Sequence, residues 1–164
     1  MSKSVVIDLG YQTYEIKDPD GEVVGVIRIN PSDPALAGRW QKAEEEIECC
    51  RAQIEAETTA GKSEIEIWPL ALEASDKIKN AIDYAFGSKV SDVLFGGSSA
   101  FSYTLSGKMV LENVLEAIAP ILQKALETSA RKAKRRMEEH TAPYQDTTKG
   151  LAPGQSVRPA EAPQ

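Results

Sequence analysis

The sequence predicts an α+β protein, with a small N-terminal antiparallel β-meander packed on a mainly helical bundle and a disordered C-terminal tail. Apolar residues recur with period two in the first thirty residues, then with helical spacing, and with no period after residue 141. The predicted parts are a meander over 1–30, a helical domain over 31–140 that forms one compact domain with it, and a tail over 141–164. With 164 residues, 41% of them apolar, one such domain can bury a sizeable core.

Three short runs of alternating apolar residues predict the strands of the meander. They are Val5, Ile7 and Leu9, then Tyr14 and Ile16, then Val23, Gly25, Ile27 and Ile29. Gly10 separates the first two runs. Asp18-Pro19-Asp20-Gly21 separates the last two, since proline presets one turn dihedral and glycine accepts a positive φ. A meander of this size is marginal alone, so its apolar face must pack on the helices.

The next segment predicts an antiparallel hairpin of two amphipathic helices. Asp33 is the expected N-cap of the first helix, with Pro34 at the first helical position. Its apolar stripe has spacings of four and three and comprises Leu36, Trp40, Ala43, Ile47, Cys50 and Ile54. After a break near Gly61, the second helix is expected to begin near Trp68-Pro69 and to end before Gly87. Its stripe comprises Ala71, Ala74, Ile78, Ile82 and Ala85.

A short helical turn over residues 91–95 and a Ser/Gly-rich loop precede the last predicted helix. The loop carries Phe101, Tyr103 and Leu105, which need cover because they are apolar. The helix is expected from about Met109 to about Glu139, with a kink at Pro120. Residues 141–164 contain four of the nine prolines and too few apolar residues to offset the entropy of ordering, which predicts disorder.

The formal net charge of -6 argues against broad binding to nucleic acid or to anionic membranes, because both polyanions would be repelled. No stretch approaches the roughly 18 consecutive apolar residues that cross a bilayer, and the N-terminus lacks a signal pattern. We therefore expect no membrane partner and a cytoplasmic location.

The motifs that could carry catalysis are incomplete, so the sequence predicts no enzyme, no catalytic residue, no cofactor and no metal site. Gly61-Lys62-Ser63 resembles the end of a phosphate-binding P-loop, but Ala56 stands where that loop has glycine, and a helix is predicted before it. His140, the only histidine, lies at the edge of the predicted tail, so we expect neither a histidine-based triad nor a multi-histidine metal site. The adjacent Cys49 and Cys50 have neither metal nor redox spacing and are interpreted as reduced helix residues.

Charge is unevenly distributed along the chain. Residues 33–86 carry twelve acidic and six basic side chains, whereas residues 87–140 carry eight basic and six acidic ones. Five of the basic residues lie within 131–136. They fit either a nucleic-acid-binding regulator or a helix end whose cations complement the helix dipole and the acidic hairpin. The two halves are complementary within one chain or between copies, which leaves a homo-oligomer open.

Three segments carry a family resemblance. They are residues 27–34, which open a Glu-rich helix, residues 82–96 with two Phe-Gly steps, and the closing helix with its Lys/Arg/Glu end. In this order, over about residues 10–140, they resemble the tail assembly chaperones of siphophages, the bacteriophages with long non-contractile tails.

The resemblance implies a chaperone that binds the tape measure protein, keeps it soluble and helps to recruit the tail tube protein during tail morphogenesis. It also implies a location in the host cytoplasm and absence from the mature virion. A virion structural tail or connector protein is the alternative, although such a subunit should contain more strands. The side chains expected to contact the client are Phe95, Phe101, Tyr103, Leu105, Trp40 and Trp68, with plain core packing as the competing interpretation.

Overall fold

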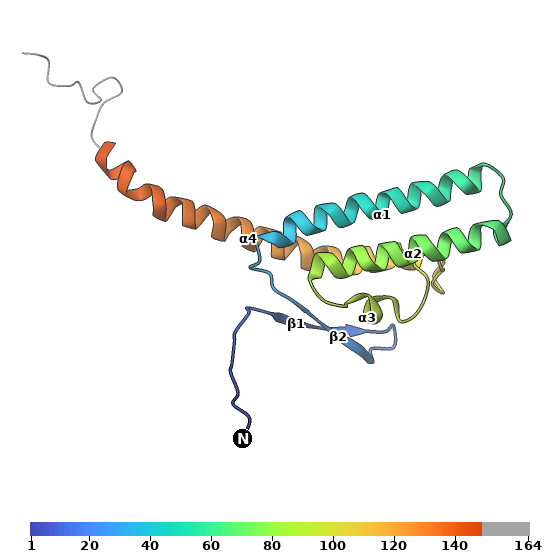
Figure 1. The fold of residues 1–164 in the computed structure, drawn as a ribbon, viewed down its shortest axis with the longest axis horizontal. Coiled ribbons are helices and arrows are strands. Elements are labelled where there is room, and N and C mark those ends of the chain that lie inside the picture. Colours follow the sequence, from blue (N-terminus) through green and yellow to red (C-terminus); the bar gives the residue numbers. More distant parts are fainter. Residues whose placement is uncertain (149–164) are drawn as a thin grey trace, which may run out of the picture. The chain divides into compact units, whose positions relative to one another are not determined.

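A computed structural model describes residues 1–148, with side chains up to residue 142. The chain divides into two units, Met1–Ser129 and a second unit that begins at Ala130. The first unit combines an N-terminal β-hairpin with helices (Figure 1), which confirms the predicted α+β class. Within the described residues, no helix is both long enough and apolar enough to cross a bilayer.

The sheet is an antiparallel hairpin of two strands, β1 (Gln12–Lys17) and β2 (Val23–Ile29). The predicted turn between them is confirmed. The Asp18 carboxylate accepts a hydrogen bond from the backbone N–H of Glu22 at 2.9 Å, and Gly21 adopts a φ of 88°. A side chain that reaches the backbone and a glycine at positive φ are the two features that make this sequence a turn.

One face of the hairpin packs on the helices. Tyr14 pairs with Ile27, and Ile16 pairs with Gly25, so alternate residues of both strands point to the same face. On β2, Ile27 and Ile29 are fully buried. On β1, Tyr14 and Ile16 are only partly buried against the same core.

The first predicted strand does not form, so the predicted three-stranded meander is wrong in this part. The chain up to Tyr11 contains no strand, and Val5, Ile7 and Leu9 are exposed. The side-chain amide of Asn30 donates to the Leu9 carbonyl at 2.8 Å, so a polar contact holds the chain at the end of β2. Period two alone predicted a strand, but it could not show that a partner strand was present.

Gly25 allows a close approach between β2 and the short helix α3 (Ser91–Phe95). A Cβ atom at Gly25 would lie 2.5 Å from Cγ1 of Val93, which is closer than non-bonded carbon atoms pack. Close packing against Val93 therefore requires glycine at position 25. The short helical turn predicted over residues 91–95 is the element that packs on β2.

Helices α1 (Ala35–Thr59) and α2 (Glu64–Phe86) form the predicted antiparallel hairpin (Figure 1). The apolar stripe predicted for α1 is buried from Leu36 to Cys50, and Ile54 is partly buried. The stripe of α2 is buried at Ala74, Ile78, Ile82 and Ala85.

The predicted start of α2 near Trp68-Pro69 is wrong, because the helix begins at Glu64. Ser63 and Glu66 form a capping box, in which the Glu66 carboxylate accepts from the Ser63 backbone N–H at 2.8 Å. This pattern of serine followed three residues later by glutamate is readable in the sequence. Pro69 instead lies inside the helix.

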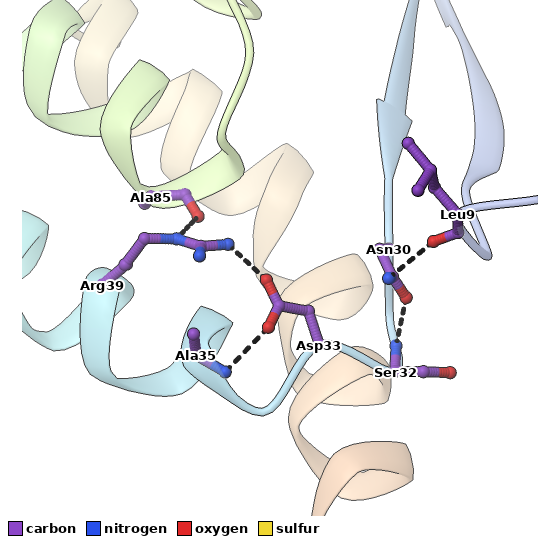
Figure 2. A network of polar contacts seen from close by, with 7 residues as sticks. All are labelled: Leu9, Asn30, Ser32, Asp33, Ala35, Arg39 and Ala85. Atoms are coloured by element: carbon purple, nitrogen blue, oxygen red, sulfur yellow. Dashed lines mark hydrogen bonds and ion pairs between the residues drawn. The ribbon is translucent and has the colours of Figure 1, made fainter. Parts of the chain in front are cut away.

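A polar network joins the start of α1 to the end of α2 (Figure 2). The first helical residue is Ala35, one later than predicted, so the N-cap position falls on Pro34 and the predicted N-cap at Asp33 is wrong by one residue. The Asp33 carboxylate nevertheless accepts a hydrogen bond from the Ala35 N–H at 2.9 Å. The second Asp33 oxygen accepts from Arg39 at 2.6 Å, and Arg39 Nε donates to the carbonyl of Ala85 at 3.1 Å.

Helix α4 (Val110–Thr148) is longer than predicted and continues through Pro120. The expected end near Glu139, and the expected start of the tail at residue 141, therefore came too early. The Thr141 hydroxyl donates to the Met137 carbonyl at 2.8 Å, a side-chain bond of the added part of the helix. The rest of the predicted disordered tail, residues 149–164, lies outside the described residues.

Gly25→Ala should destabilise the protein by about 1–3 kcal/mol, because its Cβ would press on Val93. Urea unfolding measures the change. Gly38→Ala is the control, since nothing lies within 4 Å of a Cβ at that helical position, and it should raise stability by up to about 1 kcal/mol. Equal stability of the two variants would contradict the proposed packing.

The contribution of Asp33 to stability should depend on pH. Partial burial alone would raise its pKa, but the Ala35 N–H and the Arg39 guanidinium outweigh it and hold the pKa below its ordinary value. The stabilisation is therefore complete above the ordinary pKa of about 3.9 and is lost as pH falls through the lower folded value. Asp33→Asn should be less stable than the wild type at pH 7, and the gap should shrink below about pH 4. Unfolding titrations across pH, with Asp76→Asn as a charge-matched control, provide the measurement.

Candidate protein-binding site

The six side chains predicted to contact a client do not form one surface. Phe95 is 3% exposed and belongs to the core, where Lys79 Nζ lies 5.6 Å from the centre of its ring. Trp40 is almost as deeply buried. Trp68 and Tyr103 are 63% and 71% exposed, and Leu105 is fully exposed. Phe95 and Trp40 therefore fit the core-packing interpretation. Trp68, Tyr103 and Leu105 are exposed enough to contact a client.

Phe101 and Tyr103 line a hollow of about 320 Å³ against the C-terminal part of α1, where Ile54 and Thr58 form its wall. The loop that carries them is held in place. The N–H of Ala100 bonds to the buried Ser75 hydroxyl of α2 at 2.9 Å, and the isolated bridge between Tyr103 and Met109 closes the loop. The predicted cover for these aromatic residues is thus supplied partly by α1.

Trp68 belongs to a different surface, on the outer face of α2. Ile65, Trp68 and Leu72 are all exposed, and their spacings of three and four place them on one stripe. Only Trp68 was among the predicted client contacts, although the spacing of the three residues was a readable signal.

A groove of about 690 Å³ lies between α1 and the N-terminal part of α4. Apolar side chains from the two helices form its floor and walls, and polar side chains line its rim. From α1 these are Trp40, Glu44, Ile47, Glu48 and Arg51, and from α4 they are Leu115, Ala119, Leu122, Gln123, Leu126 and Glu127. This volume is within the range of sites that bury a ligand or a side-chain cluster.

Trp40 forms one rigid wall of the groove. Its indole Nε1 donates to Glu44 at 2.7 Å, and its ring centre lies 6.1 Å from that of Phe86, with the ring planes tilted by 51°. The only polar atom of the side chain is thus already paired, so the ring can cover an apolar ligand without leaving a donor unsatisfied. Of the six predicted residues, Trp40 is the one that lines the groove.

The rim of the groove is acidic. Glu44 and Glu48 come from α1 and Glu127 from α4, against one basic side chain, Arg51. Arg51 is itself paired across the helices with Glu112 at 3.8 Å. An apolar floor with an acidic rim suits an amphipathic helix whose apolar stripe is flanked by lysine or arginine.

The groove could not be predicted from the apolar pattern of the sequence. Ile47 and Leu122 are indeed buried, but Leu115 and Leu126 are only partly covered. Helical spacing shows which face of a helix is apolar, but it does not show how completely a neighbour covers that face.

The residues considered for other chemistry have structural partners. Gly61 adopts a φ of 80° at the end of α1, Lys62 pairs with Glu57, and Ser63 caps α2. Burial, with a smaller effect from Glu46, raises the pKa of the Cys50 thiol, so this cysteine stays protonated and unreactive. Over the part of the chain that the structure describes, no three His, Cys, Asp or Glu side chains are grouped to hold a metal ion.

The five basic residues within 131–136 lie in the second unit and are exposed. Arg135 pairs with Glu139 four residues later. On a helix, five cations within six positions are distributed around the axis and do not form one narrow stripe.

Comparison of the chain with protein-family models, with curated proteins and with solved structures found no match.

Proposed function

We propose that this protein is a siphophage tail assembly chaperone that binds the tape measure protein through the groove between α1 and α4. The observation that carries the proposal is the groove itself, which offers an apolar floor with an acidic rim to a helical partner. The sequence resemblance to tail assembly chaperones supports the choice of partner. Recruitment of the tail tube protein in the host cytoplasm is part of the same proposal.

The chemistry required is binding without catalysis. An amphipathic client helix would place its apolar stripe on Trp40, Leu115 and Leu126, and burial of that stripe would supply about 25 cal/mol per Å² of apolar surface removed from water. Lysine or arginine beside the stripe would meet Glu48 and Glu127 at the rim. Several copies along one long client would bind with avidity.

The acidic surface of the chain would also keep the complex with the client soluble. Helix α1 also carries Glu45, Glu46 and Glu55, all exposed, and the chain has a net charge of -6. A coat of such subunits would cover apolar client surface and present hydrated carboxylates to water.

A nucleic-acid-binding regulator is the second candidate, favoured by the exposure of all five cations within 131–136. Binding to duplex DNA that weakens steeply with added salt would distinguish it. A virion structural subunit receives less support, because the described residues contain one hairpin of two strands.

Co-expression with the cognate tape measure protein should convert that protein from insoluble to soluble. The two chains should co-purify with more than one copy of the chaperone per client, and the complex should survive high salt because apolar burial is not screened. Light scattering on the purified complex gives the ratio. A tape measure protein that is equally soluble alone would refute the chaperone function, and a complex lost in high salt would refute the apolar mode of binding.

Ala119→Arg should weaken client binding at least about tenfold, because a long side chain would fill the groove. Ala117→Arg is a matched control, since Ala117 is also an exposed residue of α4 but does not line the groove. Both variants make the same change in charge, and both should keep the unfolding midpoint of the wild type. Affinity is measured by titration of a soluble tape measure fragment. If Tyr103→Ala weakens binding and Ala119→Arg does not, the client site lies at the loop.

A further inference from the structure

Residues 4–9 have the pattern of a β-strand but have no partner strand. Val5, Ile7 and Leu9 recur with period two, separated by Val6 and Asp8, and are 82%, 71% and 58% exposed. Burial of these three apolar side chains would be favourable, because it would remove their surface from water. The segment therefore has a strong tendency to pair with an open sheet edge.

Such an edge is present on β1. In the described residues β1 pairs only with β2, so the backbone groups on its other side have no strand neighbour. The core-facing side chains of β1, Tyr14 and Ile16, are only partly buried, whereas Ile27 and Ile29 on β2 are fully buried. The apolar face of the sheet is thus incomplete on the β1 side, where one more strand would cover it.

Polar contacts hold the segment away from the β1 edge of its own chain. Asn30 Nδ2 donates to the Leu9 carbonyl at 2.8 Å, and the Asn30 side-chain oxygen accepts from the Ser32 N–H at 2.9 Å (Figure 2). Gly10 has a φ of 71°, and its N–H bonds to the Asp8 carboxylate at 2.8 Å. In Figure 1 the segment accordingly leads away from the hairpin.

We propose that residues 4–9 of one copy add as a strand to the β1 edge of a second copy, and that the exchange is reciprocal. Val5, Ile7 and Leu9 would then lie beside Tyr14 and Ile16 and complete the apolar face of the sheet. The donor segment and the acceptor edge belong to the same chain, so a twofold dimer satisfies both copies at once. This inference does not depend on the chaperone function.

The wild-type protein should be a dimer, and Ile7→Asp should raise its dissociation constant at least about tenfold, because the carboxylate would enter the completed apolar face. Val6→Asp is the matched control. Val6 is the adjacent residue and is also exposed, but the strand period points its side chain to the opposite face, so the dimer should persist. Sedimentation equilibrium of the full chain gives both constants.

A wild-type chain that remains monomeric at high micromolar concentration would overturn the proposal. So would a dimer that Ile7→Asp leaves intact, because its interface would lie elsewhere. In a dimer made from one isotopically labelled and one unlabelled copy, contacts between Ile7 and Ile16 should appear only between copies. Contacts within one copy would show that the segment closes on its own sheet.

Discussion

The placement of Arg39 is the constraint on which much of the first unit depends. Its guanidinium binds the Asp33 carboxylate that starts α1 and the carbonyl of Ala85 near the end of α2. Trp40 follows Arg39 in α1, and Phe86 follows Ala85 in α2. The rings of Trp40 and Phe86 pack against each other. One partly buried cation therefore fixes the register of the helical hairpin and, with it, the position of the aromatic wall of the groove.

The groove lies where Trp40 and Ile47 of the α1 stripe meet partly covered leucines of α4. Ile47 is buried, yet it also forms part of the groove floor, and Leu115 of α4 is only partly covered. A fully covered stripe would be more stable but would offer nothing to a partner. The glutamates at the rim keep this partly open surface compatible with water, and in the proposed complex they would favour a cationic partner.

The β-hairpin likewise combines a buried part with an open part. Gly25 lets α3 approach β2 closely, so the inner part of the sheet is fully packed, whereas the β1 side is left open. In the proposed dimer that open side becomes the interface. Each dimer would then present two client grooves, and a long helical client that engages both would be held with greater avidity than by either groove alone.

Local chemistry in the sequence was sufficient to determine several parts of the fold. The Asp18-Pro19-Asp20-Gly21 turn, the hydrogen bond of Asp33 at the start of α1 and the stripe of α1 from Leu36 to Cys50 follow from dihedral preferences, capping and helical spacing, which act within a few residues. The capping box at Ser63 was also readable, although Pro69 drew the predicted start of α2 too far along the chain.

Only the tertiary structure decided what the apolar faces contact. The run at Val5, Ile7 and Leu9 has the period of a strand, but strand formation needs a partner edge, and Asn30 holds the chain away from it. Phe95 and Tyr103 lie eight positions apart in one segment, yet one is in the core and the other is exposed. The groove was hidden in the sequence for the same reason, since spacing reports the apolarity of a face, whereas its coverage depends on residues far away in the chain.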